Sequence, residues 1–224
     1  MTRYVRILPR TGLDHSAPEW QSQTMTRALL VVDVQESFRH KADWPLIGNP
    51  DIASQVARLV AASRVAGDLV VWILHTEPGT GGVFDPENGH VRLMAGLEPR
   101  PGEPTVPKTS INAFTTTNLH QQLTRAGVTE VVICGIRTDQ CCETTARIAA
   151  DLGYDVSYVT DATTTSPIPH PDVAGRPVGE WLADPRTLSV ADITARTEAV
   201  LGGRGFATIA TTADFVGREA VLAR

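Results

Sequence analysis

A chain of 224 residues, of which 42% are hydrophobic and 20% charged, is long enough for one sizeable α/β domain and too apolar for disorder. Its net charge of −5 does not attract a phosphate backbone, and no apolar run approaches the roughly 20 residues of a membrane-spanning helix. Nucleic-acid and membrane binding are therefore not expected. Three cysteines, two of them adjacent, do not make a disulfide framework, and no secretory signal follows the basic N-terminus. We expect reduced thiols and a cytoplasmic location.

Short apolar runs alternate with amphipathic segments from Arg27 onward. In chain order, the first half predicts a strand at 28–34, a helix at 52–66, a strand at 69–75 and a short extended run that ends near 108. The second half predicts a helix at 116–126, a strand at 131–135, a helix at 140–152, a strand at 156–162, a helix at 191–201 and a strand at 206–212. This alternation predicts an α/β fold with three α/β/α layers around a mainly parallel six-stranded sheet, of Rossmann-like type.

Two parts of the chain fall outside this alternation. Residues 1–26 precede the first core strand, and we predict that they form an N-terminal arm on a single domain of residues 27–224, packed on a partner subunit. The connections 77–107 and 163–190 are too long to be simple loops, and such loops usually carry function or subunit contacts.

Reactive side chains follow several predicted strands, at the edge where open α/β sheets bind ligands. Asp33 is a carboxylate within a buried apolar run, which is costly without a partner. From this residue alone, a catalytic role and a structural role as ion pair or helix cap are equally plausible. Lys108 gains significance only if it faces Asp33, because a lone lysine is usually a solvated surface residue.

The third reactive side chain is Cys141, in the first turn of the helix predicted to begin near Gln140. The positive end of the helix dipole favours a thiolate there, and free backbone N–H groups can hold an oxyanion. Cys142 lies about 100° further round the helix, so we expect it to pack against the sheet. Cys134 is expected to be an inert core residue.

Three segments carry a resemblance to a known family: LLVVDVQESF, VPKTSINAF and GIRTDQCCETTARIAADLGYDVSYVTDAT. With these motifs in this order, the region from Arg27 to Phe215 resembles the isochorismatase-like cysteine hydrolases. That superfamily includes nicotinamidases, N-carbamoylsarcosine amidohydrolases and ureidoacrylate hydrolases. The resemblance implies that Cys141 is the nucleophile, Asp33 the base and Lys108 an electrostatic support.

The resemblance also implies a cis peptide bond between Ile136 and Arg137. In the family this kink directs two backbone amides, here those of Arg137 and Cys141, into one oxyanion hole. A homodimer or homotetramer is implied as well.

The implied reaction is hydrolysis of a small-molecule amide or ureido C–N bond through a thioester on Cys141. No step requires a metal or an organic cofactor. One alternative is an isochorismatase-type vinyl ether hydrolase, which needs an acid and no nucleophile. Another is a non-catalytic binding protein on the same fold. The presence of Cys141 favours amide hydrolysis.

The sequence carries less information about metal binding and substrate contacts. Nicotinamidases add a metal site with an Asp-x-His element that this chain lacks, so we expect no bound metal and interpret His75 as structural. Arg137 has two interpretations, either as a ligand for a substrate carboxylate or as a partner of Asp139 or a C-terminal acid. Residues that could contact substrate, or could equally pack in the core, are Gln35, Phe38, Trp44, Phe84 and Phe114.

Overall fold

The computed structural model describes residues 26–216 and has a parallel six-stranded sheet at its centre. The sheet order is β3-β2-β1-β4-β5-β6, so the chain winds outward from β1 in one direction and then from β4 in the other. The strands are β1 (Arg27–Val32), β2 (Leu69–His75), β3 (Thr105–Lys108), β4 (Glu130–Ile136), β5 (Asp155–Thr164) and β6 (Thr208–Ala210).

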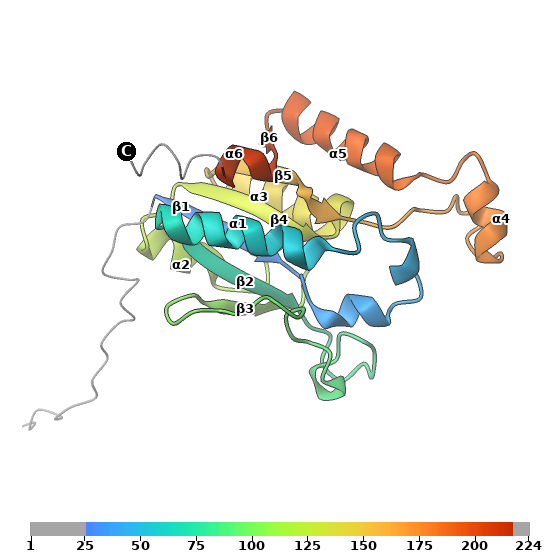
Figure 1. Cartoon of the computed structure of the whole chain (residues 1–224), viewed down its shortest axis with the longest axis horizontal. Coiled ribbons are helices and arrows are strands. Elements are labelled where there is room, and N and C mark those ends of the chain that lie inside the picture. The colour runs from blue at the N-terminus through green and yellow to red at the C-terminus, as the bar shows by residue number, and fades with distance from the viewer. Residues whose placement is uncertain (1–25, 217–224) are drawn as a thin grey trace, which may run out of the picture.

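Helices cover both faces of the sheet, which confirms the predicted three-layer α/β/α fold (Figure 1). Side chains of α1 and α6 belong to the apolar core on one face, and those of α2, α3 and α5 belong to the core on the other. The α-helices are α1 (Ile52–Ala66), α2 (Leu119–Arg125), α3 (Glu143–Asp151), α4 (Val178–Ala183), α5 (Val190–Gly203) and α6 (Thr212–Val216). Short helical turns are η2 (Glu36–His40), η3 (Trp44–Leu46), η4 (Pro86–Asn88) and the π-helical turn η5 (Thr138–Cys142).

The central strands are apolar throughout because both of their faces are buried. In β1, Leu30 and Val32 lie in the core beside α2 and α3, whereas Leu29 and Val31 lie in the core beside α1. All four side chains are fully buried. Alternate side chains of a strand point to opposite faces, so a strand covered on both sides reads as one continuous apolar run.

Several element boundaries differ from the sequence-based expectation. The first strand ends at Val32 rather than at residue 34, because Asp33 takes a left-handed backbone conformation with φ of 54°. The segment 140–152 is divided into η5 and α3. The last strand stops at Ala210, because Thr212 begins α6 and its N–H donates to Asp161. The connection 163–190 contains α4, which Figure 1 shows far from the sheet.

The predicted N-terminal arm lies almost entirely outside the described residues, as does the end of the predicted domain 27–224. Within residues 26–216, none of the helices combines the length and the apolar character needed to span a bilayer.

An ionic cluster joins α3 to α5 on one face of the sheet. Glu143 is 4% exposed and accepts hydrogen bonds from Arg147, at 2.7 Å, and from Thr197, at 2.9 Å. Arg196 of α5 also donates to Glu143. The cluster therefore holds the helix that follows Cys141 against the neighbouring helix.

Candidate active site

The structure brings Asp33, Lys108 and Cys141 together at the carboxyl edge of the sheet. Asp33 follows β1, Lys108 ends β3, and Cys141 lies in the turn η5 after β4. Lys108 Nζ is 2.7 Å from Asp33 Oδ2, and both side chains are fully buried. The same ammonium donates to Cys141 Sγ at 3.6 Å. The three reactive side chains predicted from separate segments thus form one contact group.

The Lys108 ammonium has four neighbours that can accept a hydrogen bond. Besides Asp33 and Cys141, it faces the carbonyl oxygen of Ser110 at 3.1 Å and Nδ1 of His75 at 3.4 Å. An ammonium group has three N–H donors and no acceptor. One N–H group must therefore be shared by two of the four acceptors, and the orientation of the ammonium decides which two.

Burial dominates the electrostatics of this group. Burial raises the pKa of Asp33 above its usual value, although the neighbouring Lys108 charge acts to lower it. Burial, followed by the negative charge of Asp33, raises the pKa of the Cys141 thiol to about 12. The expectation of a thiolate favoured by the helix end is wrong, because desolvation of the buried sulfur outweighs the helix dipole. At neutral pH the resting sulfur is therefore a protonated thiol.

The turn η5 separates Cys141 from the other two thiols. Cys141 is 4% exposed and lines a cavity, whereas Cys142 is fully buried in the core beside α3. Cys134, in β4, is fully buried in the core on the opposite face. Burial also raises the pKa of Cys134 and Cys142 well above the usual value for a thiol. Only Cys141 among these thiols combines a cavity with a charged partner.

The backbone before Cys141 is closely packed. The peptide bond between Ile136 and Arg137 is cis, as the resemblance implied. The carbonyl of Arg137 accepts from the N–H groups of Gln140, at 3.3 Å, and of Cys142, at 3.1 Å. Gly135 has φ of 132°, and a Cβ added there would lie 1.9 Å from the Val32 carbonyl oxygen. Only glycine therefore permits this approach of β4 to β1.

A cavity of about 140 Å³ opens onto Cys141. It is smaller than the roughly 300–1,000 Å³ of typical ligand pockets, so it admits a small molecule or the small end of a larger one. Of the predicted substrate contacts, Phe38 and Phe84 line it. Its full lining consists of Asp33, Phe38, Lys41, His75, Glu77, Phe84, Ile111, Arg137, Gln140 and Cys141.

The other three predicted substrate contacts lie outside this lining. Gln35 is fully buried, and its amide hydrogen-bonds the backbone N–H and C=O of His75 at 2.7 and 3.0 Å. Trp44 is half-buried in η3, under the guanidinium of Arg39. Phe114 packs in the core, with its ring stacked 6.2 Å from that of Tyr154.

Arg137 lines the cavity, and its side chain bonds to residues of two neighbouring loops. The guanidinium donates to Asp43 at 2.6 Å and to Ser166, and it lies 5.7 Å from the centre of the Phe38 ring. Partial burial acts to raise the pKa of Asp43, but the hydrogen bond and charge of Arg137 outweigh it and hold that pKa below its usual value. Asp139, one partner considered from sequence, instead accepts from Thr165 at 2.6 Å.

Sequence reasoning missed the polar neighbours Lys41, His75 and Glu77. His75 was interpreted as structural, yet it lines the cavity and contacts Lys108. The available signal was its position: it ends a strand at the same edge of the sheet as Asp33. The register that pairs His75 with Lys108 belongs to the tertiary fold, and the local pattern does not contain it.

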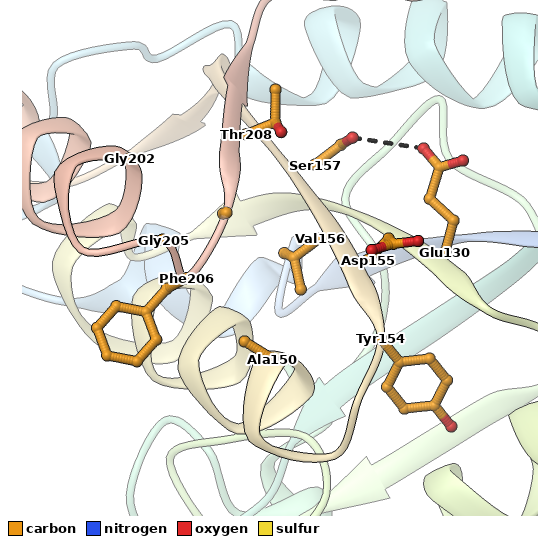
Figure 2. Close-up of a pocket in the computed structure, with 11 residues that line it drawn as sticks. Glu130, Ala150, Tyr154, Asp155, Val156, Ser157, Gly202, Gly205, Phe206 and Thr208 are labelled. Carbon is orange, nitrogen blue, oxygen red and sulfur yellow. Dashed lines mark hydrogen bonds between the residues drawn. The ribbon is translucent and has the colours of Figure 1, made fainter.

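A wider cavity of about 570 Å³ lies at the opposite, amino-terminal edge of the sheet (Figure 2). Glu130 and Asp155, which begin β4 and β5, contribute to its lining, and Ser157 donates to Glu130 at 3.4 Å. No thiol lines this cavity. Among residues 26–216, no group of three or more His, Cys, Asp or Glu side chains is placed to hold a metal ion.

The sequence matches the isochorismatase domain family over residues 27–174. Streptothricin hydrolase from Streptomyces noursei is 39% identical over 152 residues, which cover 66% of this chain and 53% of that enzyme. The chain thus spans about half the length of this relative. The ureidoacrylate amidohydrolase RutB from Variovorax paradoxus is 29% identical over 170 residues, covering 61% of this chain and 68% of that protein.

Solved structures share the fold. The crystal structure of an isochorismatase from Pseudomonas putida matches with a TM-score of 0.72 and 28% identity. The match covers 86% of this chain and 91% of that one.

Proposed function

The chain belongs to the isochorismatase family and is a hydrolase, and from this premise we propose that it cleaves a small-molecule amide or ureido C–N bond through a thioester on Cys141. The observation that carries the proposal is the buried contact group. Its carboxylate and ammonium lie 2.7 Å apart, and the ammonium lies 3.6 Å from a thiol at a cavity.

The first step is activation of the thiol by Asp33. Because burial raises the pKa of Cys141 to about 12, a preformed thiolate is scarce at neutral pH. The thiol proton instead passes to Asp33 as the sulfur attacks, and negative charge moves from the carboxylate to the sulfur. Lys108 contacts both atoms, so one positive charge faces one negative charge before and after the transfer.

Bond formation and cleavage then follow in two halves. Sγ bonds to the carbonyl carbon, and the carbonyl oxygen becomes an oxyanion held by the backbone N–H groups of Arg137 and Cys141. Collapse breaks the C–N bond, and protonated Asp33 delivers its proton to the leaving nitrogen. Water next attacks the thioester and gives one proton to Asp33. Breaking the C–S bond releases the acid, and the sulfur recovers that proton.

The name of one relative, an amidohydrolase, favours a C–N bond as the target. One relative is named an amidohydrolase of ureidoacrylate and the other a hydrolase of streptothricin. The cavity of about 140 Å³ suits a compact carbonyl group beside the sulfur. Vinyl ether hydrolysis needs an acid and no nucleophile, so it would not require the thiol. The thiol therefore favours amide hydrolysis over that reaction.

The test is a panel of small primary amides and ureido acids, read by ammonia release and by mass spectrometry of the quenched protein. We expect turnover by the unmodified chain and a trapped acyl adduct on Cys141. Cys141→Ala should abolish both, whereas Cys142→Ala, the matched control for a neighbouring buried thiol, should retain turnover. Turnover by Cys141→Ala at the rate of the unmodified chain would refute covalent catalysis.

A further inference from the structure

The last residue of β2, His75, contacts the proposed catalytic group and lines the same cavity. Its Nδ1 lies 3.4 Å from Lys108 Nζ, and its Nε2 lies 3.2 Å from Glu77 Oε1. We propose that His75 is a positioning residue, whose Nδ1 holds one N–H of the Lys108 ammonium and so directs another toward Asp33 and Cys141. This inference rests on the proposed covalent mechanism and adds to it a residue that acts through the lysine.

The imidazole ring is fixed from several sides. Gln35 is fully buried, and its side-chain amide bonds both backbone groups of His75, accepting at 2.7 Å and donating at 3.0 Å. The ring of Phe84 meets the imidazole edge-on, with 5.2 Å between ring centres. Parallel pairing places His75 directly opposite Lys108 in the sheet. These contacts hold the backbone of His75 and pack against its ring, so that Nδ1 faces the lysine.

The two contacts of the ring determine its tautomer. An ammonium has only donors, so Nδ1 must face Lys108 with its lone pair. The single proton of the neutral ring is then on Nε2, which donates to the Glu77 carboxylate. An imidazolium would direct a second N–H at the ammonium. The other charged groups near the ring are Asp33, at the end of β1, and Lys41, whose ammonium lies 5.8 Å from the centre of the Phe84 ring.

The role of this contact follows from the number of donors. Four acceptors surround the three N–H groups of Lys108. When His75 and the Ser110 carbonyl each take one, the third N–H is left for Asp33 and Cys141. That donor can follow the negative charge as it passes from oxygen to sulfur. Without the imidazole acceptor, the ammonium is free to turn away from the sulfur.

A matched pair of variants separates this role from simple packing. In His75→Asn, the amide oxygen is as many bonds from the backbone as Nδ1, so it can still accept from Lys108. In His75→Gln, the amide is one carbon further out, at the position of Nε2, so it can reach Glu77 but not Lys108. Each variant is treated with iodoacetamide at neutral pH, and alkylation of Cys141 is followed by peptide mass mapping. The buried thiols of Cys134 and Cys142 serve as internal references.

We expect His75→Asn to alkylate within about threefold of the unmodified rate and His75→Gln to be about 10-fold slower, the effect of losing a charge-assisted hydrogen bond. If His75→Gln does not fold, His75→Phe provides a second variant without an acceptor and should be slowed by the same factor.

Two results would overturn the role of His75: equal slowing in the asparagine and glutamine variants, or an unmodified rate in the variants that lack the acceptor. The covalent mechanism fails separately. In that case the unmodified chain itself would label Cys141 no faster than Cys134 and Cys142.

Discussion

Replacing Lys108 with methionine removes a buried positive charge and leaves a side chain of similar length. Asp33 then keeps no cation within contact distance, because Lys108 Nζ at 2.7 Å is its only ion-pair partner among residues 26–216. At that distance, and with an effective dielectric constant of about 20, the lost attraction is about 6 kcal/mol. Removing one partner of a buried ion pair costs about 3–5 kcal/mol of stability. We expect urea unfolding at pH 7 to show that the variant loses free energy of unfolding in this range.

The cause of this lower stability can be identified from how it depends on pH. Burial already raises the pKa of Asp33, and removing Lys108 raises it further. Below the usual aspartate pKa of about 3.9, the carboxyl is protonated in both folded and unfolded chains, so the deficit of Lys108→Met is smallest there. The deficit grows once the pH exceeds the folded pKa of Asp33 in the unmodified chain, because its carboxyl then ionises beside Lys108 while that of the variant stays protonated. The double variant Asp33→Asn, Lys108→Met should recover most of the loss at pH 7. A single-variant cost below about 1 kcal/mol would refute the assignment of Asp33 as a charged base.

Three further substitutions test the packing around the site, each by urea unfolding at pH 7. Gly135→Ala places a Cβ 1.9 Å from the Val32 carbonyl oxygen and should cost at least about 3 kcal/mol. Gly175→Ala, where nothing lies within 4 Å, is its control and should stay within about 0.5 kcal/mol of the unmodified chain; equal effects would contradict the steric reasoning. Glu143→Gln weakens charged hydrogen bonds from two arginines and should cost about 2 kcal/mol, and an unchanged midpoint would show that these pairs contribute nothing. Ser189→Ala removes the capping box of α5 and should cost about 1 kcal/mol, while stability equal to the unmodified chain would refute the cap.

The fold could be predicted from sequence because its signals are local. The helix α1 begins and ends at the predicted residues, since Gly67 with φ of 77° stops it. Apolar runs of strand length, separated by helices, specify a covered parallel sheet. Once the sheet is parallel, its carboxyl ends share one edge. That geometry explains why side chains from distant segments, such as Asp33 and Cys141, can be placed together from the sequence alone.

The remaining features depend on tertiary contacts that a local pattern does not contain. Arg137 pairs with Asp43, 94 residues away, rather than with its neighbour Asp139. His75 acquires a chemical partner only through the register of β2 on β3. The state of the thiol was misjudged for the same reason. Helix position is visible in a sequence, but the degree of burial that raises the pKa of Cys141 to about 12 is not.

Because Lys108 lies on β3, the proposed catalysis depends on the local stability of the sheet. This strand has four residues and forms one edge of the sheet, where it pairs with β2. Amides at such an edge exchange with solvent through openings that cost less free energy than global unfolding. An opening that includes Lys108 would withdraw the ammonium from Asp33 while the thiol stays in η5. The molecule would then keep the rest of its secondary structure and lose the reactivity of its thiol. Deuterium uptake by β3 should therefore measure how often the folded protein is inactive.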